Sequence, residues 1–319
     1  MTPRRLDSTC ELRLKPTCPF NFAGTVWKKS HFPSPVEAFE KGVLWFTMRI
    51  NRSVLGVRVS QVRSGDVRAR IYSARPLTEA EQGAVETELR WRFDLDVDLE
   101  SFLSMASRDE ALRQVVARWK GTRVKCCQSL YELLCIGVVL QNATVRRSVQ
   151  MFENLLRAYG TPVIFDDKFL YCFWTPKKLA NAGDADLRAL RVGYRSTHLT
   201  RQANQFSKGE WQDLELRRLD RPVLHRRLLS IYGVGPATAW IIEFEAFHCY
   251  DALDHISPWE TKIYGQLLFA KDQVSADEIL HRIDGWRPWR MLAMHYLFED
   301  VFWRHGETPI PWLQTLIRL

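Results

Sequence analysis

The chain has 319 residues, of which 46% are hydrophobic and 26% charged, and its formal net charge is +8 at pH 7. This composition is typical of a soluble globular protein of two or three domains, and it argues against a disordered chain. The basic balance favours an acidic partner, for which nucleic acid is the usual candidate. The seven cysteines contain no Cys-x-x-Cys pair and no signal-peptide core is recognised, so we expect a reduced cytoplasmic or nuclear protein without an iron–sulfur cluster.

The part of the chain from about residue 11 to residue 92 is predicted to form a small antiparallel sheet covered by one helix. Two runs rich in β-branched and aromatic residues, Leu44–Ile50 and Val54–Val62, are separated by a short polar turn, which is typical of a hairpin. The covering helix is expected to start at Thr78, because Glu81 follows three residues later and the pair has the spacing of a capping box.

Beyond about residue 94 almost every signal is helical. Polar cap residues precede amphipathic or apolar stretches of helical length, and glycine or proline follows several of them. The predicted helices are Ser107–Trp119, Ser129–Gln141, Thr144–Tyr159, a short one from Thr175, Asp184–Leu190, Ser196–Phe206, Arg221–Tyr232, Pro236–Phe247, Pro258–Phe269, Ser275–Ile283 and Trp289–Trp303. We therefore predict an α+β fold, with a sheet domain over residues 1–92 and a two-lobed helical domain over residues 93–319.

One stretch, residues 228–240, is predicted to join two of these helices through a tight turn. Gly233 and Gly235 are expected to supply positive φ angles and an open backbone. Pro236 suits the first turn of the next helix, where its missing N–H costs nothing. Unpaired N–H groups and a positive helix end then point at one spot, which suits an anion such as phosphate. An ordinary antiparallel helix pair is the alternative.

Four motifs in order resemble the helix-hairpin-helix superfamily of DNA glycosylases over roughly residues 93–300. The hairpin, residues 221–247, carries Gly233-Val234-Gly235-Pro236-Ala237-Thr238-Ala239, and Pro258-Trp259-Glu260 follows it. The helix entry at 121–132, running on to Gln141, and Trp286-Arg287-Pro288-Trp289-Arg290 resemble the 3-methyladenine glycosylase branch. Gly193-Tyr194-Arg195 is similar to a turn of the 8-oxoguanine glycosylases. The resemblance implies an enzyme that flips a damaged base out of duplex DNA and cleaves its glycosidic bond.

The resemblance also implies a set of DNA-binding positions. The hairpin would hold a phosphate through backbone N–H groups, a cation would bind hairpin carbonyls near Tyr232 and Val234, and a wedge residue would fill the space left by the flipped base. Arg201 is a further candidate for a strand contact, with a solvated arginine as the alternative. No other cofactor is expected. The predicted DNA-binding residues are Gly233, Val234, Gly235, Ala237, Thr238, Arg195 and the wedge pair Gln141 and Asn142.

Cleavage of the glycosidic bond develops positive charge on the sugar, which a nearby carboxylate stabilises while it orients water. The family places Asp at the third position of Pro-x-Asp, and this chain has Glu260 there. Glu260 also fits a capping box with Ser257, which is the structural alternative. Asp254 is the rival catalytic carboxylate, and the choice between the two stays open.

Family members that also cut the strand carry a lysine where this chain has Ala237. Lys262 matches no nucleophile position, so we predict a monofunctional, water-using enzyme. The base is expected to stack on side chains near the last helices, although all of them could instead belong to the core. The predicted base pocket consists of Phe298, Trp240, Ile241, Met294 and Trp259.

The substrate stays open among an alkylated purine, a bulky or hypermodified base such as a modified cytosine of phage DNA, and 8-oxoguanine. A helix-hairpin-helix protein that binds DNA without catalysis is the alternative from another class, because Glu replaces Asp at position 260. In either case we expect a monomer that binds double-stranded DNA and does not associate with a membrane. We expect it to be associated with the nucleoid in the cytoplasm, or with the nucleus in a eukaryote.

Overall fold

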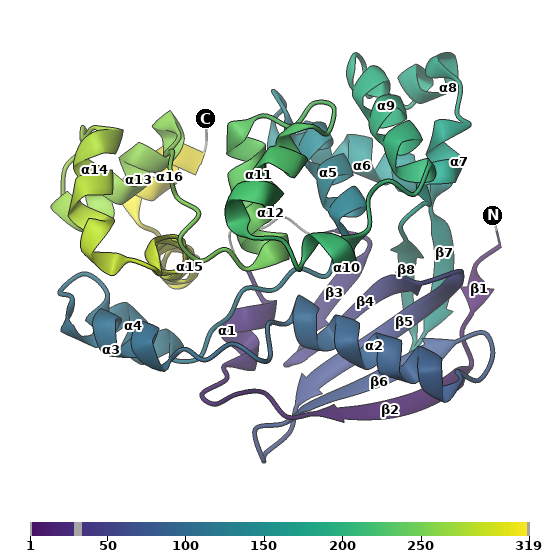
Figure 1. The fold of residues 1–319 in the computed structure, drawn as a ribbon, viewed down its shortest axis with the longest axis horizontal. Coiled ribbons are helices and arrows are strands. Elements are labelled where there is room, and N and C mark those ends of the chain that lie inside the picture. Colours follow the sequence, from purple (N-terminus) through teal and green to yellow (C-terminus); the bar gives the residue numbers. More distant parts are fainter. Residues whose placement is uncertain (1, 29–33, 318–319) are drawn as a thin grey trace.

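The computed structural model describes residues 2–28 and 34–317, and its larger sheet has the strand order β2-β6-β5-β4-β3 (Figure 1). Every neighbouring pair in this sheet is antiparallel, and β4 and β5 form the predicted hairpin around a two-residue turn. Asn51 takes a φ of +52° in that turn, which Asn tolerates better than most residues. The strands are β2 (Ser8–Leu14), β3 (Glu37–Glu40), β4 (Val43–Ile50), β5 (Ser53–Gln61) and β6 (Val67–Ser73).

Helix α2 (Glu79–Arg92) covers one face of this sheet, as predicted, and α1 (Phe22–Val26) packs into the same core. The capping box that was expected to start α2 is present: the Thr78 N–H donates to Glu81 at 2.9 Å, and the Glu81 N–H donates to the Thr78 hydroxyl at 3.3 Å. Apolar residues that face the sheet from α2, including Val85 and Leu89, are fully buried. The N-terminal part of the chain therefore has the predicted architecture.

A second, three-stranded sheet was not predicted. It has the order β1-β7-β8, with β1 (Arg4–Arg5) parallel to β7 (Thr161–Phe165) and β7 antiparallel to β8 (Lys168–Cys172). Asp166 and Asp167 form the turn with φ of +48° and +59°, the mirror-image turn that suits a two-residue hairpin. The expectation of helices alone beyond residue 94 is wrong here, although two apolar runs around an Asp-Asp turn carried the signal.

The helices predicted after residue 94 are largely present, with shifted ends. The run predicted as Ser107–Trp119 begins only at Arg113, because Asp109 accepts a hydrogen bond from the Ala111 N–H at 2.9 Å and turns the chain. Within the described ranges, no helix has the length and apolar character needed to cross a membrane. The helices of this part are α3 (Glu100–Arg108), α4 (Arg113–Trp119), α5 (Leu130–Leu140), α6 (Val145–Tyr159), α7 (Pro176–Ala180), α8 (Asp184–Ala189), α9 (Arg195–Ser207), α10 (Asp213–Leu216), α11 (Arg221–Leu229), α12 (Pro236–Phe247), α13 (Pro258–Phe269), α14 (Ala276–Ile283), the 3-10 helix η1 (Asp284–Trp286), α15 (Arg290–Glu307) and α16 (Pro311–Ile317).

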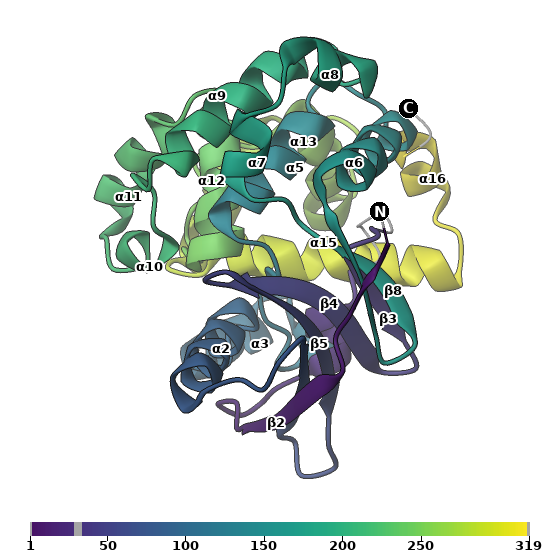
Figure 2. The ribbon, with the colours of Figure 1, turned by 90° about the vertical axis from the view of Figure 1, so that its right-hand side faces the viewer.

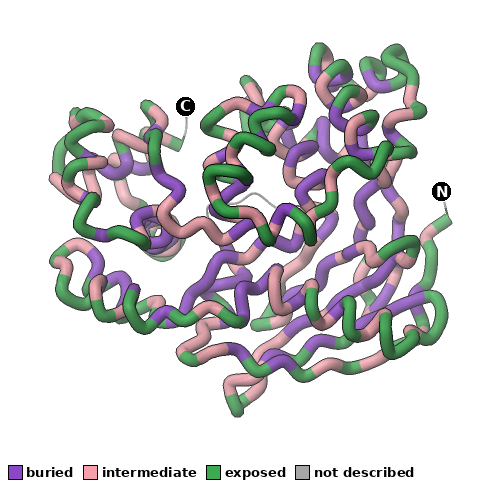
Figure 3. The backbone as a smooth tube through the Cα atoms, in the orientation of Figure 1, coloured by how far each residue is buried: buried purple, intermediate pink, exposed green. Residues whose placement is uncertain are grey.

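Helix α12 lies between two apolar cores of the helical part. Its Ala239, Ile242 and Phe247 pack with α5, α6, α9 and α11, whereas its Phe244 packs with α3, α4, α13, α14 and α15. Figure 2 shows α15 in side view between the sheet and the other helices, and Figure 3 shows buried segments concentrated where these layers meet. The mixed α+β fold is thus confirmed, while the boundary at residues 92 and 93 stays a prediction.

Candidate functional site

The turn between α11 and α12 is held in place by two glutamines of α9. The Gln205 side chain accepts from the Tyr232 N–H at 3.1 Å, and Gln202 donates to the Tyr232 carbonyl at 3.0 Å. Gly233 has the predicted positive φ, at +81°. Gly235 does not: its φ of −95° is open to any residue, so the prediction of a positive φ there is wrong.

A buried carboxylate joins α11 to α12. Glu243 of α12 has no exposed side-chain surface and accepts from the Arg221 guanidinium at 3.0 Å, while its other oxygen lies 2.6 Å from His225 Nδ1. Both partners belong to α11, so the two helices are joined by charge as well as by the apolar contacts of Leu224 and Leu228. The turn is therefore fixed from α9 on one side and by the α11–α12 pair on the other.

The first turn of α12 offers backbone N–H groups to an anion. Gly235 is the N-cap and supplies no side chain to cap the helix, Pro236 follows at N1, and Ala237 is exposed beside a half-buried Thr238. The N–H groups at such a helix start have no partner within the helix and sit at its positive end. The predicted phosphate contacts and the predicted cation on the carbonyls of Tyr232 and Val234 both stay predictions.

Two alanine substitutions separate the structural role of this turn from its binding role. We expect Gly235→Ala to leave stability unchanged, because a Cβ there meets no atom within 4 Å, and to weaken duplex DNA binding by blocking the approach of the backbone. Gly233→Ala is expected to cost about 1 to 2 kcal/mol of unfolding free energy, because of its positive φ and a Cβ placed 2.8 Å from His198. Thermal melts and filter binding measure both, and unchanged DNA affinity of Gly235→Ala would remove the turn from the binding site.

The predicted wedge residues lie in the turn between α5 and α6. Gln141 is the C-cap of α5, and the exposed Asn142 takes a φ of +47° and donates to the Tyr194 hydroxyl at 3.4 Å. Leu140 at the end of α5 is 40% exposed and Tyr194 at the start of α9 is 48% exposed, so large side chains beside this turn face solvent. This placement suits insertion into a duplex, which stays a prediction.

Arg195 takes a different role from the predicted DNA contact. Its side chain is only 2% exposed, and the guanidinium donates to the carbonyls of Val138 and Gln141 at the end of α5. A buried side chain bound to two carbonyls is not presented to a nucleic acid backbone. Arg195 therefore holds the turn between α5 and α6, whereas the other candidate, Arg201, is exposed and lies 4.5 Å from the centre of the Tyr232 ring.

The two candidate carboxylates occupy different surroundings. Asp254 lies 2.5 Å from the Arg221 guanidinium and 3.7 Å from that of Arg290, so two cations already offset its charge. Glu260 forms the expected capping box: one of its oxygens accepts from the Ser257 N–H at 2.9 Å. Within residues 2–28 and 34–317 no ion pair involves Glu260, and its carboxylate lies at the positive end of α13, held by the capping box.

The predicted base-pocket residues do not all come together. The rings of Trp259 and Phe298 meet edge to face with centroids 5.9 Å apart, and Glu260 follows Trp259 in the first turn of α13. Trp240 is stacked between His225 and His255 instead, at 6.3 and 5.5 Å. The neighbouring Ile241 is 49% exposed and stays a candidate.

Met294 is a misassigned pocket residue. Its side chain has no exposed surface and packs in the core that α15 shares with α3, α4, α13 and α14. The apolar periodicity of α15 does not by itself separate a core position from a pocket position. The core alternative therefore holds for Met294.

A group of buried and partly buried ionisable residues, absent from the predictions, lies on α12, on α15 and just after α1. Lys28 is 6% exposed, and its Nζ lies 2.7 Å from Nε2 of His295. Burial lowers the pKa of Lys28, and the charges of Glu299 and Glu245 oppose that shift. Burial raises the pKa of Glu245 to about 7, and the charge of Lys28 opposes that shift. We call Lys28, Glu245, His295 and Glu299 the Lys28 cluster.

The Lys28 cluster extends toward Glu260. Burial raises the pKa of the Tyr264 hydroxyl well above its usual value, and the negative charges of Glu260 and Glu299 raise it further. Glu299 also follows Phe298, the residue whose ring meets Trp259. The sequence signal was weak: Glu245, His295 and Glu299 are polar residues on otherwise buried helix faces, and nothing marks Lys28.

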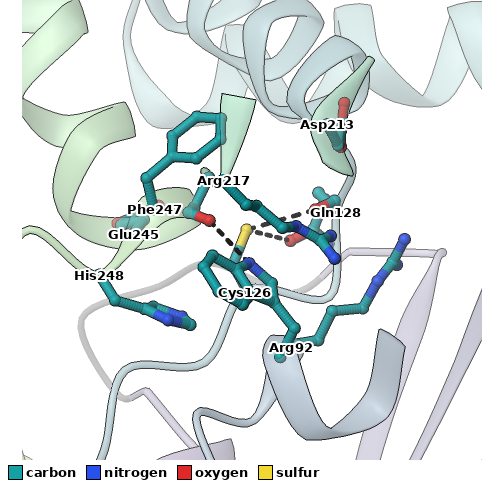
Figure 4. A pocket seen from close by; sticks show the side chains of 10 residues that line it. Arg92, Cys126, Gln128, Asp213, Arg217, Glu245, Phe247 and His248 are labelled. Atoms are coloured by element: carbon teal, nitrogen blue, oxygen red, sulfur yellow. Dashed lines mark hydrogen bonds between the residues drawn. The ribbon is translucent and has the colours of Figure 1, made fainter. Parts of the chain in front are cut away.

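Glu245 also borders a small pocket between α2, α10 and the end of α12 (Figure 4). The Trp91 indole donates to the Ala246 carbonyl at 3.0 Å, and Cys126 lines the same pocket. Burial raises the pKa of the Cys126 thiol far above its usual value, so the thiol is not a nucleophile at neutral pH. This pocket therefore offers no activated thiol beside the Lys28 cluster.

No protein-family model matches the chain. A DNA-3-methyladenine glycosylase of Bacillus subtilis (strain 168) is 22% identical over 236 residues, which cover 73% of this chain and 77% of that protein. The 3-methyladenine DNA glycosylase structure from Archaeoglobus fulgidus aligns with a TM-score of 0.72 and 18% identity, over 92% of this chain and 98% of that one. The apo-form of a Clostridium acetobutylicum 8-oxoguanine glycosylase/lyase aligns with a TM-score of 0.60 and 21% identity, over 83% and 98% of the two chains. The neighbours of this chain are thus 3-methyladenine and 8-oxoguanine DNA glycosylases, consistent with the helix-hairpin-helix DNA glycosylase superfamily.

Proposed function

We propose that the protein is a DNA glycosylase that flips a damaged or modified base out of duplex DNA and hydrolyses its N-glycosidic bond. The observation that carries this proposal is the position of Glu260. It stands in the first turn of α13 without an ion pair among the described residues, directly after Trp259, whose ring meets that of Phe298. The names of the similar proteins, which are DNA glycosylases, point in the same direction.

In the proposed reaction each part of the site has one task. The N–H groups at the start of α12 bind a phosphate and fix the duplex, and the α5–α6 turn fills the space of the flipped base. The base stacks on Trp259 and Phe298. As the glycosidic bond breaks, positive charge develops on the sugar, and the Glu260 carboxylate stabilises that charge and orients the attacking water.

The enzyme is proposed to be monofunctional. A lyase needs an amine that forms an imine with the sugar, and the exposed position near the start of α12 holds Ala237. One similar structure is a glycosylase/lyase, so the distinction needs its own test. We expect base release without strand cleavage at neutral pH, and no adduct when borohydride is added to the reaction. A borohydride-trapped protein–DNA adduct would contradict this prediction.

The proposed substrates are an alkylated purine or a bulky, hypermodified base, such as a modified cytosine of phage DNA in a defence role. Release of free base from duplexes with alkylated, oxidised, deaminated and modified-cytosine bases tests the proposal directly. The protein is proposed to act as a monomer on cellular DNA, in the nucleoid or in a nucleus.

A DNA-binding protein without catalysis is the second candidate. The capping box of Glu260 favours it, because that carboxylate already serves the fold by accepting from the Ser257 N–H. A purified protein that shifts modified duplexes in a gel but releases no base from any of them would support this candidate over the glycosylase.

A further inference from the structure

One face of α9 carries a row of side chains that ends at the turn between α11 and α12. Tyr194, His198 and Arg201 are four and three residues apart, so they lie on the same face of the helix. The rings of Tyr194 and His198 meet edge to face with centroids 6.0 Å apart. The His198 ring lies 5.2 Å from that of Tyr232, and the Arg201 guanidinium lies 4.5 Å from the centre of the Tyr232 ring. The row therefore continues from α9 onto the turn through direct contacts.

The two ends of this row touch the two turns that are proposed to contact DNA. At one end the Tyr194 hydroxyl accepts from Asn142, in the turn between α5 and α6, at 3.4 Å. At the other end the Gly233 backbone packs against His198, because a Cβ added to Gly233 would lie only 2.8 Å from the imidazole Cδ2. Seven residues of helix rise about 10 Å, which is the axial length of about three nucleotides of one strand. DNA that contacts both turns would therefore lie over this row.

His198 has hydrogen-bonding capacity that the described residues do not use. Its Nδ1 is a buried atom without a hydrogen-bond partner within residues 2–28 and 34–317. A buried N–H without an acceptor is costly, so the tautomer with the proton on Nε2 is favoured. Nε2 belongs to the ring edge that faces Gly233, 3.7 Å from the position of a Cβ there. His198 therefore presents a donor beside the backbone N–H groups of the turn.

Arg201 adds a positive charge that no acidic side chain offsets. Helix α9, residues 195–207, contains no Asp or Glu, and no ion pair of Arg201 is present in the described part of the chain. Arg201 is exposed, yet its guanidinium is stacked on the Tyr232 ring, which holds it beside the turn. A stacked guanidinium keeps its N–H groups available, and their geometry suits two hydrogen bonds to a phosphate. The contact with Tyr232 thus distinguishes Arg201 from an arginine that is only solvated.

We propose that His198 and Arg201 extend the phosphate site of the α11–α12 turn onto α9, and that both side chains bind the DNA backbone next to the turn. This inference rests on the DNA binding of the proposed function and gives neither residue a part in bond cleavage. Backbone contacts carry no information about the bases, so these two should strengthen binding to modified and unmodified duplexes equally.

The test measures equilibrium binding of wild type, His198→Phe and Arg201→Met to duplexes over a range of salt concentrations. One position of the duplex carries an unmodified base, 7-methylguanine or 5-hydroxymethylcytosine. His198→Phe keeps an aromatic ring against Tyr194 and Tyr232 and removes both nitrogens. Arg13→Met is the matched control for the loss of one arginine charge, because the Arg13 side chain is 68% exposed but lies on β2 of the larger sheet.

We expect each α9 variant to bind every duplex about tenfold more weakly than wild type, the usual order for the loss of a hydrogen bond to a charged group. Arg201→Met should also lower the slope of log affinity against log salt concentration by about one, while Arg13→Met changes neither affinity nor slope. His198→Phe should melt no lower than wild type, because it removes a buried nitrogen that has no partner. If it does not fold, Arg201→Met still provides the test, since its side chain is exposed.

The outcomes separate this inference from the glycosylase. An affinity within about twofold of wild type in either folded variant would overturn the inference and leave the glycosylase in place, as would a loss confined to the modified duplexes. Tenfold losses in a protein that releases no base would support the inference and overturn the glycosylase. A wild-type protein that binds no duplex would overturn both.

Discussion

Replacing Glu260 with Gln should slow base release about 10²- to 10³-fold, the usual effect of removing one group that stabilises transition-state charge. The substitution removes the negative charge and keeps the size of the side chain. If the proposed reaction is right, positive charge on the sugar then develops without its stabilising carboxylate, and water loses its orienting group.

The capping box makes this substitution cleaner than most at a catalytic position. Glu260 accepts from the Ser257 N–H through one oxygen, and Gln at the same helix position satisfies a capping box equally well. The start of α13 and the melting temperature should therefore be preserved. Loss of activity can then be assigned to the missing charge rather than to a disturbed helix.

Asp254→Asn is the matched control for Glu260→Gln. Asp254 is ion-paired with Arg221 and faces Arg290, so its charge serves the contact between α11 and the start of α15. We expect base release within a few-fold of wild type. Single-turnover release of free base by both variants decides between the carboxylates: a full loss in Asp254→Asn with an active Glu260→Gln would reverse the assignment.

Local sequence signals predicted the helix starts well. Thr78 and Ser257 each cap a helix with a glutamate three residues on, as predicted, and the helices predicted from Ser129 and Ser275 start with the same arrangement. These signals involve residues within one helical turn, so they do not depend on how the helix packs in the tertiary structure.

The roles of long side chains were much harder to predict. Arg195 and Met294 were expected at the site, and both are buried, because tertiary packing decides which face of α9 and α15 meets a neighbour. Lys28 was not singled out, since its contact with His295 joins residues 267 positions apart. Pairings of this kind depend on the assembled layers and leave no local pattern.

The role of Arg123 likewise depends on tertiary contacts that its local sequence does not indicate. Its side chain is 1% exposed, and its guanidinium donates to four carbonyls, those of Asp94 at 2.7 Å, Val97 at 2.9 Å, Pro19 at 3.2 Å and Thr17. These carbonyls belong to the segment before α1 and to the chain between α2 and α3. One side chain therefore ties the N-terminal segment to the entry of the helical part.

Arg123→Met should lower the free energy of unfolding by about 3 to 5 kcal/mol, because it leaves one buried and three partly buried carbonyls without this donor, and a fully buried one costs about 1 to 3 kcal/mol before local rearrangement. Arg13→Met is the control: Arg13 pairs with the Asp66 carboxylate at 2.6 Å, but its side chain is 68% exposed, and surface pairs contribute little. Urea titrations of the two variants measure the difference. A midpoint for Arg123→Met equal to that of Arg13→Met would mean that water replaces the guanidinium, and that the junction is held by the apolar contacts of α1 and α2 instead.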